Sequence, residues 1–88
     1  MFKDMADPLR LYIKPWCPWC QRAMALLDER GYRYERIDVT SDAAGFEEMR
    51  KRSGQPLTPT LVTGELVLAD FGPEQLDAFL EKHGILPG

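Results

Sequence analysis

The two cysteines of this 88-residue chain, Cys17 and Cys20, are separated by two residues. A thiol attacks a disulfide only as its thiolate, so a catalytic cysteine needs surroundings that stabilise negative charge. Residues three apart on a helix lie on the same side, so a disulfide between these two would form with little distortion. A disulfide that closes such a small loop removes little entropy from the unfolded chain, so it is better suited to reversible redox chemistry than to stabilising the fold. The spacing predicts a dithiol in which Cys17 attacks and Cys20 resolves.

The residues on either side predict that Cys17 lies at the start of a helix. Alternating apolar residues predict a strand over residues 9–13, and a helical apolar period predicts a helix over residues 18–30. Pro18 suits the first helical position, which makes Cys17 the N-cap. The free N–H groups and the dipole there should lower the pKa of Cys17. Cys20 faces apolar positions and should stay buried and protonated.

The cysteine pair alone is also compatible with a zinc site or with two inert, partly buried thiols. A structural zinc site needs four ligands, and His83 is the only other nitrogen or sulfur ligand of the usual kind in the sequence. This shortage of ligands argues against zinc, so no metal is expected.

The remaining elements follow from hydrophobic periodicity and from glycine and proline residues. They are, in chain order, a strand over 32–39, a helix from a cap at Thr40, Ser41 or Asp42 to about Lys51, a hairpin of strands 60–63 and 66–69, and a helix from Pro73 to a stop at Gly84. The order β-α-β-α-β-β-α predicts an α/β fold, a four-stranded mixed sheet flanked by helices.

Composition and charge exclude several classes of protein. With 44% hydrophobic and 28% charged residues, the chain has the composition of an ordinary globular protein. A net charge of -3 argues against nucleic acid or an anionic membrane as partner. Residues 1–8 form a polar leader without the apolar core of a signal peptide, followed by a single domain over residues 9–88. Because two cysteines cannot form the multi-disulfide framework of a small secreted domain and no signal peptide is seen, we expect a cytoplasmic protein, and we expect it to be a monomer. In that reducing compartment a close cysteine pair is more often catalytic or metal-binding than a permanent disulfide.

The segment Lys14-Pro15-Trp16-Cys17-Pro18-Trp19-Cys20 resembles the active-site motif of the glutaredoxins, which belong to the thioredoxin-fold superfamily. That motif is a basic residue, two further residues and then Cys-Pro-aromatic-Cys. Leu57-Thr58-Pro59 is similar to the Thr-Val-Pro loop of the family, whose proline is cis and faces the active cysteine. The resemblance covers about residues 9–84. It implies a thioredoxin-like fold and a thiol-disulfide oxidoreductase that uses glutathione as co-substrate.

The resemblance also implies which residues form the substrate cleft. The implied glutathione-binding residues are Lys14, Gln55, Thr58, Pro59, Gly72 and Glu74. Lys14 would in addition stabilise the thiolate of Cys17. Trp16 and Trp19 flank that cysteine and would offer flat apolar contacts to a substrate.

Two alternatives concern the reductant and the class of function. The turn Phe71-Gly72-Pro73-Glu74 departs from the family's Gly-Gly-x-Asp-Asp turn and resembles the glutaredoxin-like hydrogen donors of ribonucleotide reductase. The resemblance therefore implies disulfide proteins such as ribonucleotide reductase as partners, with thioredoxin reductase as an alternative electron donor. In a different class, two copies with glutathione would share an iron–sulfur cluster through Cys17.

Overall fold

The computed structural model describes residues 8–87 and has the element order predicted from the sequence. The elements are β1 (Leu9–Ile13), α1 (Pro18–Glu29), β2 (Tyr34–Asp38), α2 (Ala43–Ser53), β3 (Thr60–Thr63), β4 (Leu66–Ala69) and α3 (Pro73–Lys82). The predicted leader lies outside the described residues except for Pro8. None of the described helices is long and apolar enough to cross a membrane.

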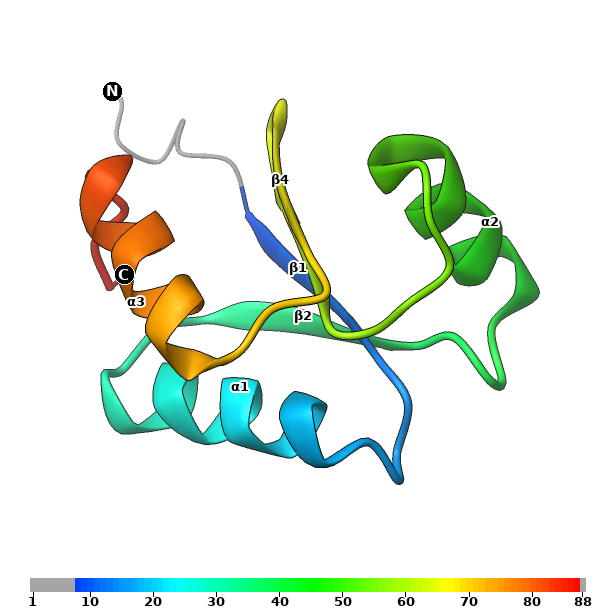
Figure 1. The fold of residues 1–88 in the computed structure, drawn as a ribbon, viewed down its shortest axis with the longest axis horizontal. Coiled ribbons are helices and arrows are strands. Elements are labelled where there is room, and N and C mark those ends of the chain that lie inside the picture. Colours follow the sequence, from blue (N-terminus) through cyan, green and yellow to red (C-terminus); the bar gives the residue numbers. More distant parts are fainter. Residues whose placement is uncertain (1–7, 88) are drawn as a thin grey trace.

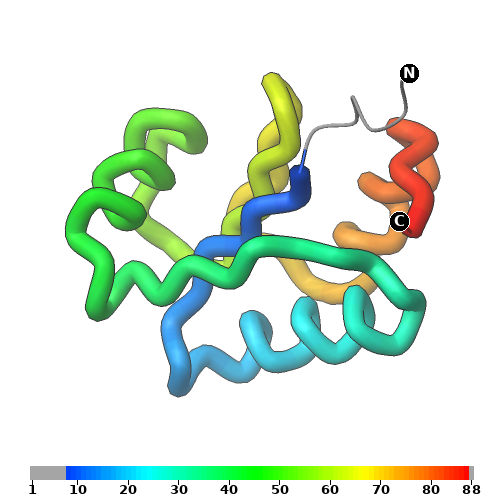
Figure 2. Tube along the Cα trace, turned by 180° about the vertical axis from the view of Figure 1, so that it is seen from behind, coloured from blue at the N-terminus to red at the C-terminus, as the bar shows by residue number. Residues whose placement is uncertain are grey.

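The strands form one four-stranded mixed sheet in the order β2-β1-β3-β4. β1 pairs with β2 in parallel, and β3 pairs antiparallel with both β1 and β4. Helices α1 and α3 lie on one side of the sheet and α2 lies on the other, as Figures 1 and 2 show from opposite directions. The predicted mixed sheet with helices on both faces is thus confirmed.

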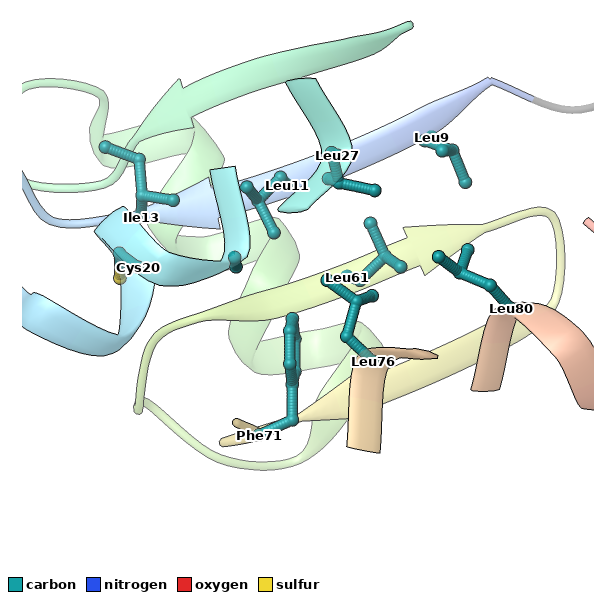
Figure 3. Close-up of a cluster of buried hydrophobic side chains, with 10 residues drawn as sticks. Leu9, Leu11, Ile13, Cys20, Leu27, Leu61, Phe71, Leu76 and Leu80 are labelled. Carbon is teal, nitrogen blue, oxygen red and sulfur yellow. The ribbon is translucent and has the colours of Figure 1, made fainter. Parts of the chain in front are cut away.

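The side chains of β1 alternate between the two faces because successive residues of a strand point in opposite directions. Leu9, Leu11 and Ile13 point toward α1 and α3 and join a buried apolar cluster that includes Leu27. Figure 3 shows this cluster, with Cys20 at one end of it. The resolving position predicted from the sequence is therefore part of the hydrophobic core.

The face covered by α2 is smaller and is held partly by polar contacts. The fully buried Tyr12 donates its hydroxyl to Glu48 Oε1 at 2.7 Å, and Arg10 pairs with Glu48 Oε2 at 2.8 Å. Gly45 permits the close approach of α2, since a Cβ atom there would lie 2.6 Å from Cγ2 of Ile37. The buried residues of α2 are Gly45 and Met49.

Local signals explain most of the element boundaries. Asp42, one of the three caps considered, accepts the N–H of Gly45 at 2.9 Å. The helix that it caps runs to Ser53, two residues past the predicted end, because the left-handed residue that closes it is Gly54, with φ of 74°. Strand β2 is shorter than the predicted strand over residues 32–39, because only residues 34–38 pair with β1.

Candidate active site

Cys17 occupies the N-cap of α1, as predicted. Its backbone is extended, with φ of -82° and ψ of 114°, and its Sγ accepts the N–H of Cys20 at 3.2 Å. Its own N–H donates to the carbonyl oxygen of Lys14 at 3.1 Å, which closes the turn between β1 and the helix. The first turn of α1 contains no acidic residue. At this position the unpaired N–H groups of the first turn and the positive end of the helix dipole stabilise a negative charge on the sulfur.

A second segment of the chain reaches the same sulfur. The carbonyl oxygen of Thr58 lies 3.8 Å from Cys17 Sγ, and the Thr58–Pro59 peptide bond is cis, as the resemblance implied. Pro59 is fully buried. Both predicted parts of the site, the cysteine turn and the proline loop, therefore meet at Cys17.

The two sulfurs have opposite protonation preferences. Burial of Cys17 favours its neutral thiol, but hydrogen bonds from the Cys20 thiol, the Cys20 N–H and the Thr58 side chain outweigh burial and lower its pKa. Burial raises the pKa of Cys20 to about 11, and its hydrogen bond to Cys17 contributes to that rise. Cys20 is 0% exposed, and both cysteines are free thiols. The pair has the asymmetry that a nucleophile and a protonated second thiol require.

The two tryptophans lie at the surface around Cys17. The side chain of Trp16 is 70% exposed and that of Trp19 is 50% exposed. Cζ of Arg22 lies 4.6 Å from the ring centroid of Trp19, within the range of a cation–π contact. The same ring also packs on the start of α3, since a Cβ atom added to Gly72 would lie 3.4 Å from Cζ3 of Trp19.

The start of α3 has few backbone donors left for an anion. Gly72 is the N-cap, and its N–H already donates to Oε1 of Gln75 at 2.7 Å. Pro73 follows and has no N–H. Glu74 is exposed and places a carboxylate in the first turn. The helix end that lies beside Trp19 is therefore partly capped from within and carries its own negative charge.

For two other predicted cleft residues, Lys14 and Gln55, the structure gives the position but does not test the predicted role. Lys14 is half-buried at the end of β1, and its role at the thiolate stays a prediction. The amide of Gln55 is bonded within its own loop, with Nε2 2.8 Å from Ser53 Oγ and Oε1 accepting the N–H of Leu57 at 2.8 Å. Its predicted glutathione contact also stays a prediction.

Three features near the site were not predicted from the sequence: the contact of Arg22 with Trp19, the cap formed by Gln75 and the exposure of Leu57. Arg22 follows Trp19 by three residues on a helix, a spacing that signals contact between side chains. Gln75 stands at N3 of α3, the usual place for a side chain that binds the N-cap N–H. Leu57 is 49% exposed next to Thr58, and no local pattern marks that exposure. Across residues 8–87, no group of three or more histidine, cysteine or acidic side chains is arranged to hold a metal ion.

Comparison with known proteins agrees with this geometry. The glutaredoxin family profile matches residues 9–67. Glutaredoxin 3 of Escherichia coli K12 is 40% identical over 53 residues, an alignment that covers 60% of this chain and 64% of that protein, so the match spans less than two thirds of its length.

Solved structures extend the likeness over more of the chain. The thioredoxin-like protein BC3987 superposes with a TM-score of 0.75 at 32% identity, covering 82% of this chain and 99% of that one. A buckwheat glutaredoxin in complex with glutathione gives 0.64 at 26% identity, covering 89% and 69%. The predicted thioredoxin-like fold is confirmed by these superpositions. The profile match, the cysteine turn and the fold together show that the chain belongs to the glutaredoxin family.

Proposed function

We propose that the protein is a dithiol oxidoreductase that reduces disulfides through Cys17 and Cys20. The observation that carries the proposal is the position of Cys17 Sγ at the N-cap of α1, where it accepts the N–H of Cys20 at 3.2 Å. The lowered pKa of Cys17 favours its thiolate, while the thiol of Cys20 stays protonated one turn further into the core. The cytoplasm, where close cysteine pairs serve catalysis, is the compartment in which we place it.

The reaction takes place in two exchanges. The Cys17 thiolate attacks one sulfur of the substrate disulfide, forms a mixed disulfide and releases the other sulfur as a thiolate. Cys20 then gives up its proton and attacks Sγ of Cys17, which releases the second substrate sulfur and leaves a Cys17–Cys20 disulfide. The substrate gains two electrons and the protein loses two. Two thiols of glutathione, or one dithiol of a protein reductase, return them.

The surroundings of Cys17 favour a substrate with apolar atoms near its disulfide. Trp16, Trp19 and Leu57 are three of the four large apolar side chains that are exposed among the described residues. Two of them flank Cys17 in the sequence, and Leu57 precedes the Thr58 carbonyl that faces its sulfur. Exposed aromatic side chains beside a reactive group supply binding area for a protein segment. We therefore propose protein disulfides, and mixed disulfides of proteins with glutathione, as substrates.

Parallel assays on the reduced Cys20→Ser protein test the mechanism. With a protein disulfide as substrate, the variant should stop at the mixed disulfide on Cys17, because no internal thiol resolves it. With a glutathione mixed disulfide, activity should persist, since external glutathione resolves the intermediate. Mass spectrometry would detect the trapped complex. Full turnover of protein disulfides by this variant would contradict the assignment of Cys20 as the resolving thiol.

The start of α3 favours a second candidate, in which a protein reductase recharges the active site. With the N–H of Gly72 bonded to Gln75 and no N–H on Pro73, this helix end offers fewer donors to a carboxylate of glutathione. The carboxylate of Glu74 would also repel that anion. The complex of the buckwheat glutaredoxin with glutathione supports the first candidate, in which glutathione recharges the active site.

A single comparison of electron donors separates the two candidates. Turnover of one protein disulfide is measured with glutathione plus glutathione reductase, and in a matched reaction with NADPH plus thioredoxin reductase. Turnover by the glutathione system alone identifies a glutathione-dependent oxidoreductase. Turnover with NADPH and thioredoxin reductase alone identifies the second candidate, a hydrogen donor that a protein reductase recharges. Failure of both donors to support any turnover would contradict the proposed function.

A further inference from the structure

The side-chain amide of Gln55 is engaged on both sides within its own loop. Nε2 lies 2.8 Å from Ser53 Oγ and 3.0 Å from Thr60 Oγ1, and Oε1 accepts the N–H of Leu57 at 2.8 Å. The fully buried Thr60 donates its hydroxyl to the Leu57 carbonyl at 2.8 Å. The Ser53 hydroxyl donates to the carbonyl of Met49 at 2.7 Å, which ties the group to the end of α2.

This braced loop ends at the nucleophile. Thr58 lies between Leu57, which Gln55 holds, and Pro59, whose carbonyl accepts the N–H of Asp70 at 2.9 Å. The next residue, Thr60, is already paired with β1 and β4 in the sheet. Thr58 is thus fixed from both directions, and its carbonyl oxygen lies 3.8 Å from Cys17 Sγ.

We propose that Gln55 is a positioning residue for Cys17, because its amide fixes the peptide that holds Thr58 against the sulfur. The role differs from the glutathione contact implied by the family resemblance. An amide whose donors and acceptor are already bonded must break internal hydrogen bonds before it can bind a carboxylate. The inference rests on the proposed function in one respect, since it takes Cys17 as the reacting sulfur.

The position of Thr58 has a chemical consequence at the sulfur. Burial of Cys17 raises its pKa, and a hydrogen bond from the Thr58 side chain is among the interactions that lower it. If the brace is removed, Thr58 is free to leave the sulfur. The thiolate then loses that side-chain donor, and the neutral thiol loses only the long contact of 3.8 Å to the Thr58 carbonyl oxygen. The effect of Gln55 on Cys17 should therefore be visible in the reduced protein without any substrate.

The test compares Gln55→Met and Thr60→Val with the control Tyr34→Phe. The first two remove opposite ends of the contact between Gln55 and Thr60, whereas the control removes a hydrogen bond of 2.9 Å to Asp28 at the far end of α1. The pKa of Cys17 is measured from the pH dependence of its alkylation by iodoacetamide. We expect it to rise by about 0.5 units or more in both loop variants and to stay at the wild-type value in the control. The effect of the double variant should be smaller than the sum of the two single effects, because the two residues share one contact and both bond to Leu57.

A wild-type pKa of Cys17 in a folded Gln55→Met protein, with a raised KM for a glutathione mixed disulfide, would show direct binding and overturn the inference. If Gln55→Met does not fold, the folded Thr60→Val protein decides, and an unchanged pKa there also overturns it. The thiol titration needs no turnover. If the wild-type protein is inactive with both electron donors, the proposed function is contradicted, but the effect of Gln55 on the pKa of Cys17 can still be measured.

Discussion

The rim of the active site and its interior differ more than the three-residue spacing of the cysteines suggests. At the rim, Cys17 lies among backbone donors and exposed tryptophans, and its pKa is lowered. In the interior, Cys20 is enclosed by the apolar cluster of α1, α3 and the sheet, and burial raises its pKa to about 11. One helical turn thus separates a sulfur whose thiolate is favoured from a sulfur whose neutral thiol is favoured. This difference favours Cys17 over Cys20 as the attacking sulfur of the proposed reaction.

The largest expected effect comes from removing the sulfur at the rim. We expect Cys17→Ser to lower disulfide reductase activity by at least about 10³-fold, a loss typical of a deleted nucleophile. The fold should persist, because the side chain is half-buried and the replacement is of similar shape. Circular dichroism supplies the control for folding. Substantial activity in the folded variant would show that Cys17 is not the attacking sulfur.

The next effect is the difference in reactivity between the two thiols. With a pKa of about 11 against an ordinary value of 9.0, Cys20 near neutral pH has a thiolate fraction about 100-fold below that of an ordinary thiol. Brief treatment of the reduced protein with iodoacetamide at pH 7 should therefore label Cys17 alone. Fragmentation of the peptide that contains both cysteines locates the label. Unfolding the protein in urea should abolish the selectivity, and equal labelling of the native thiols would refute the contrast.

Protein stability should respond to pH through Cys20. Its pKa is raised in the folded state, so the neutral thiol stabilises the fold below pH 9, and this stabilisation is lost as pH rises toward 11. Because the Cys20 thiol also lowers the pKa of Cys17, the test uses a background without Cys17. Between pH 8 and pH 10 the reduced Cys17→Ser protein should lose about 1 kcal/mol more than the Cys17→Ser/Cys20→Ala protein. Tyr12 and Tyr34, whose pKa values burial raises to about 12, act equally in both proteins and cancel. Urea unfolding at the two pH values gives the difference, and parallel losses would contradict it.

The smallest effect is expected at the rim contact between Arg22 and Trp19. Because Trp19 is half exposed, Arg22→Ala should cost only about 0.5 kcal/mol of unfolding free energy. Arg22→Lys retains a cation and serves as the matched variant. Chemical denaturation of the two variants and the wild type measures the cost. A loss of several kcal/mol would mean that this contact is part of the core rather than of the rim.

The sequence by itself determined the order of the elements and singled out the two cysteines as the candidate reacting pair. Hydrophobic periodicity, Pro18, and the Cys-x-x-Cys spacing are local signals, and they located β1, α1 and the N-cap position of Cys17. The match of Leu57-Thr58-Pro59 to a known loop also supplied the proline opposite the sulfur. The end of α2 was placed two residues early because several residues near it were compatible with a helix.

Only the tertiary structure decided what surrounds the sulfurs. Thr58 and Cys17 are 41 residues apart, and Tyr12 and Glu48 are 36 apart, so no local period connects them. The packing of Trp19 on Gly72 likewise depends on how α3 docks beside α1. The same holds for Gln55, whose amide could face either a ligand or its own loop until the backbone of residues 53–60 was placed. Local sequence specifies which sulfur atoms are present at the site, whereas long-range packing sets the hydrogen-bond donors and the burial that shift their pKa values in opposite directions.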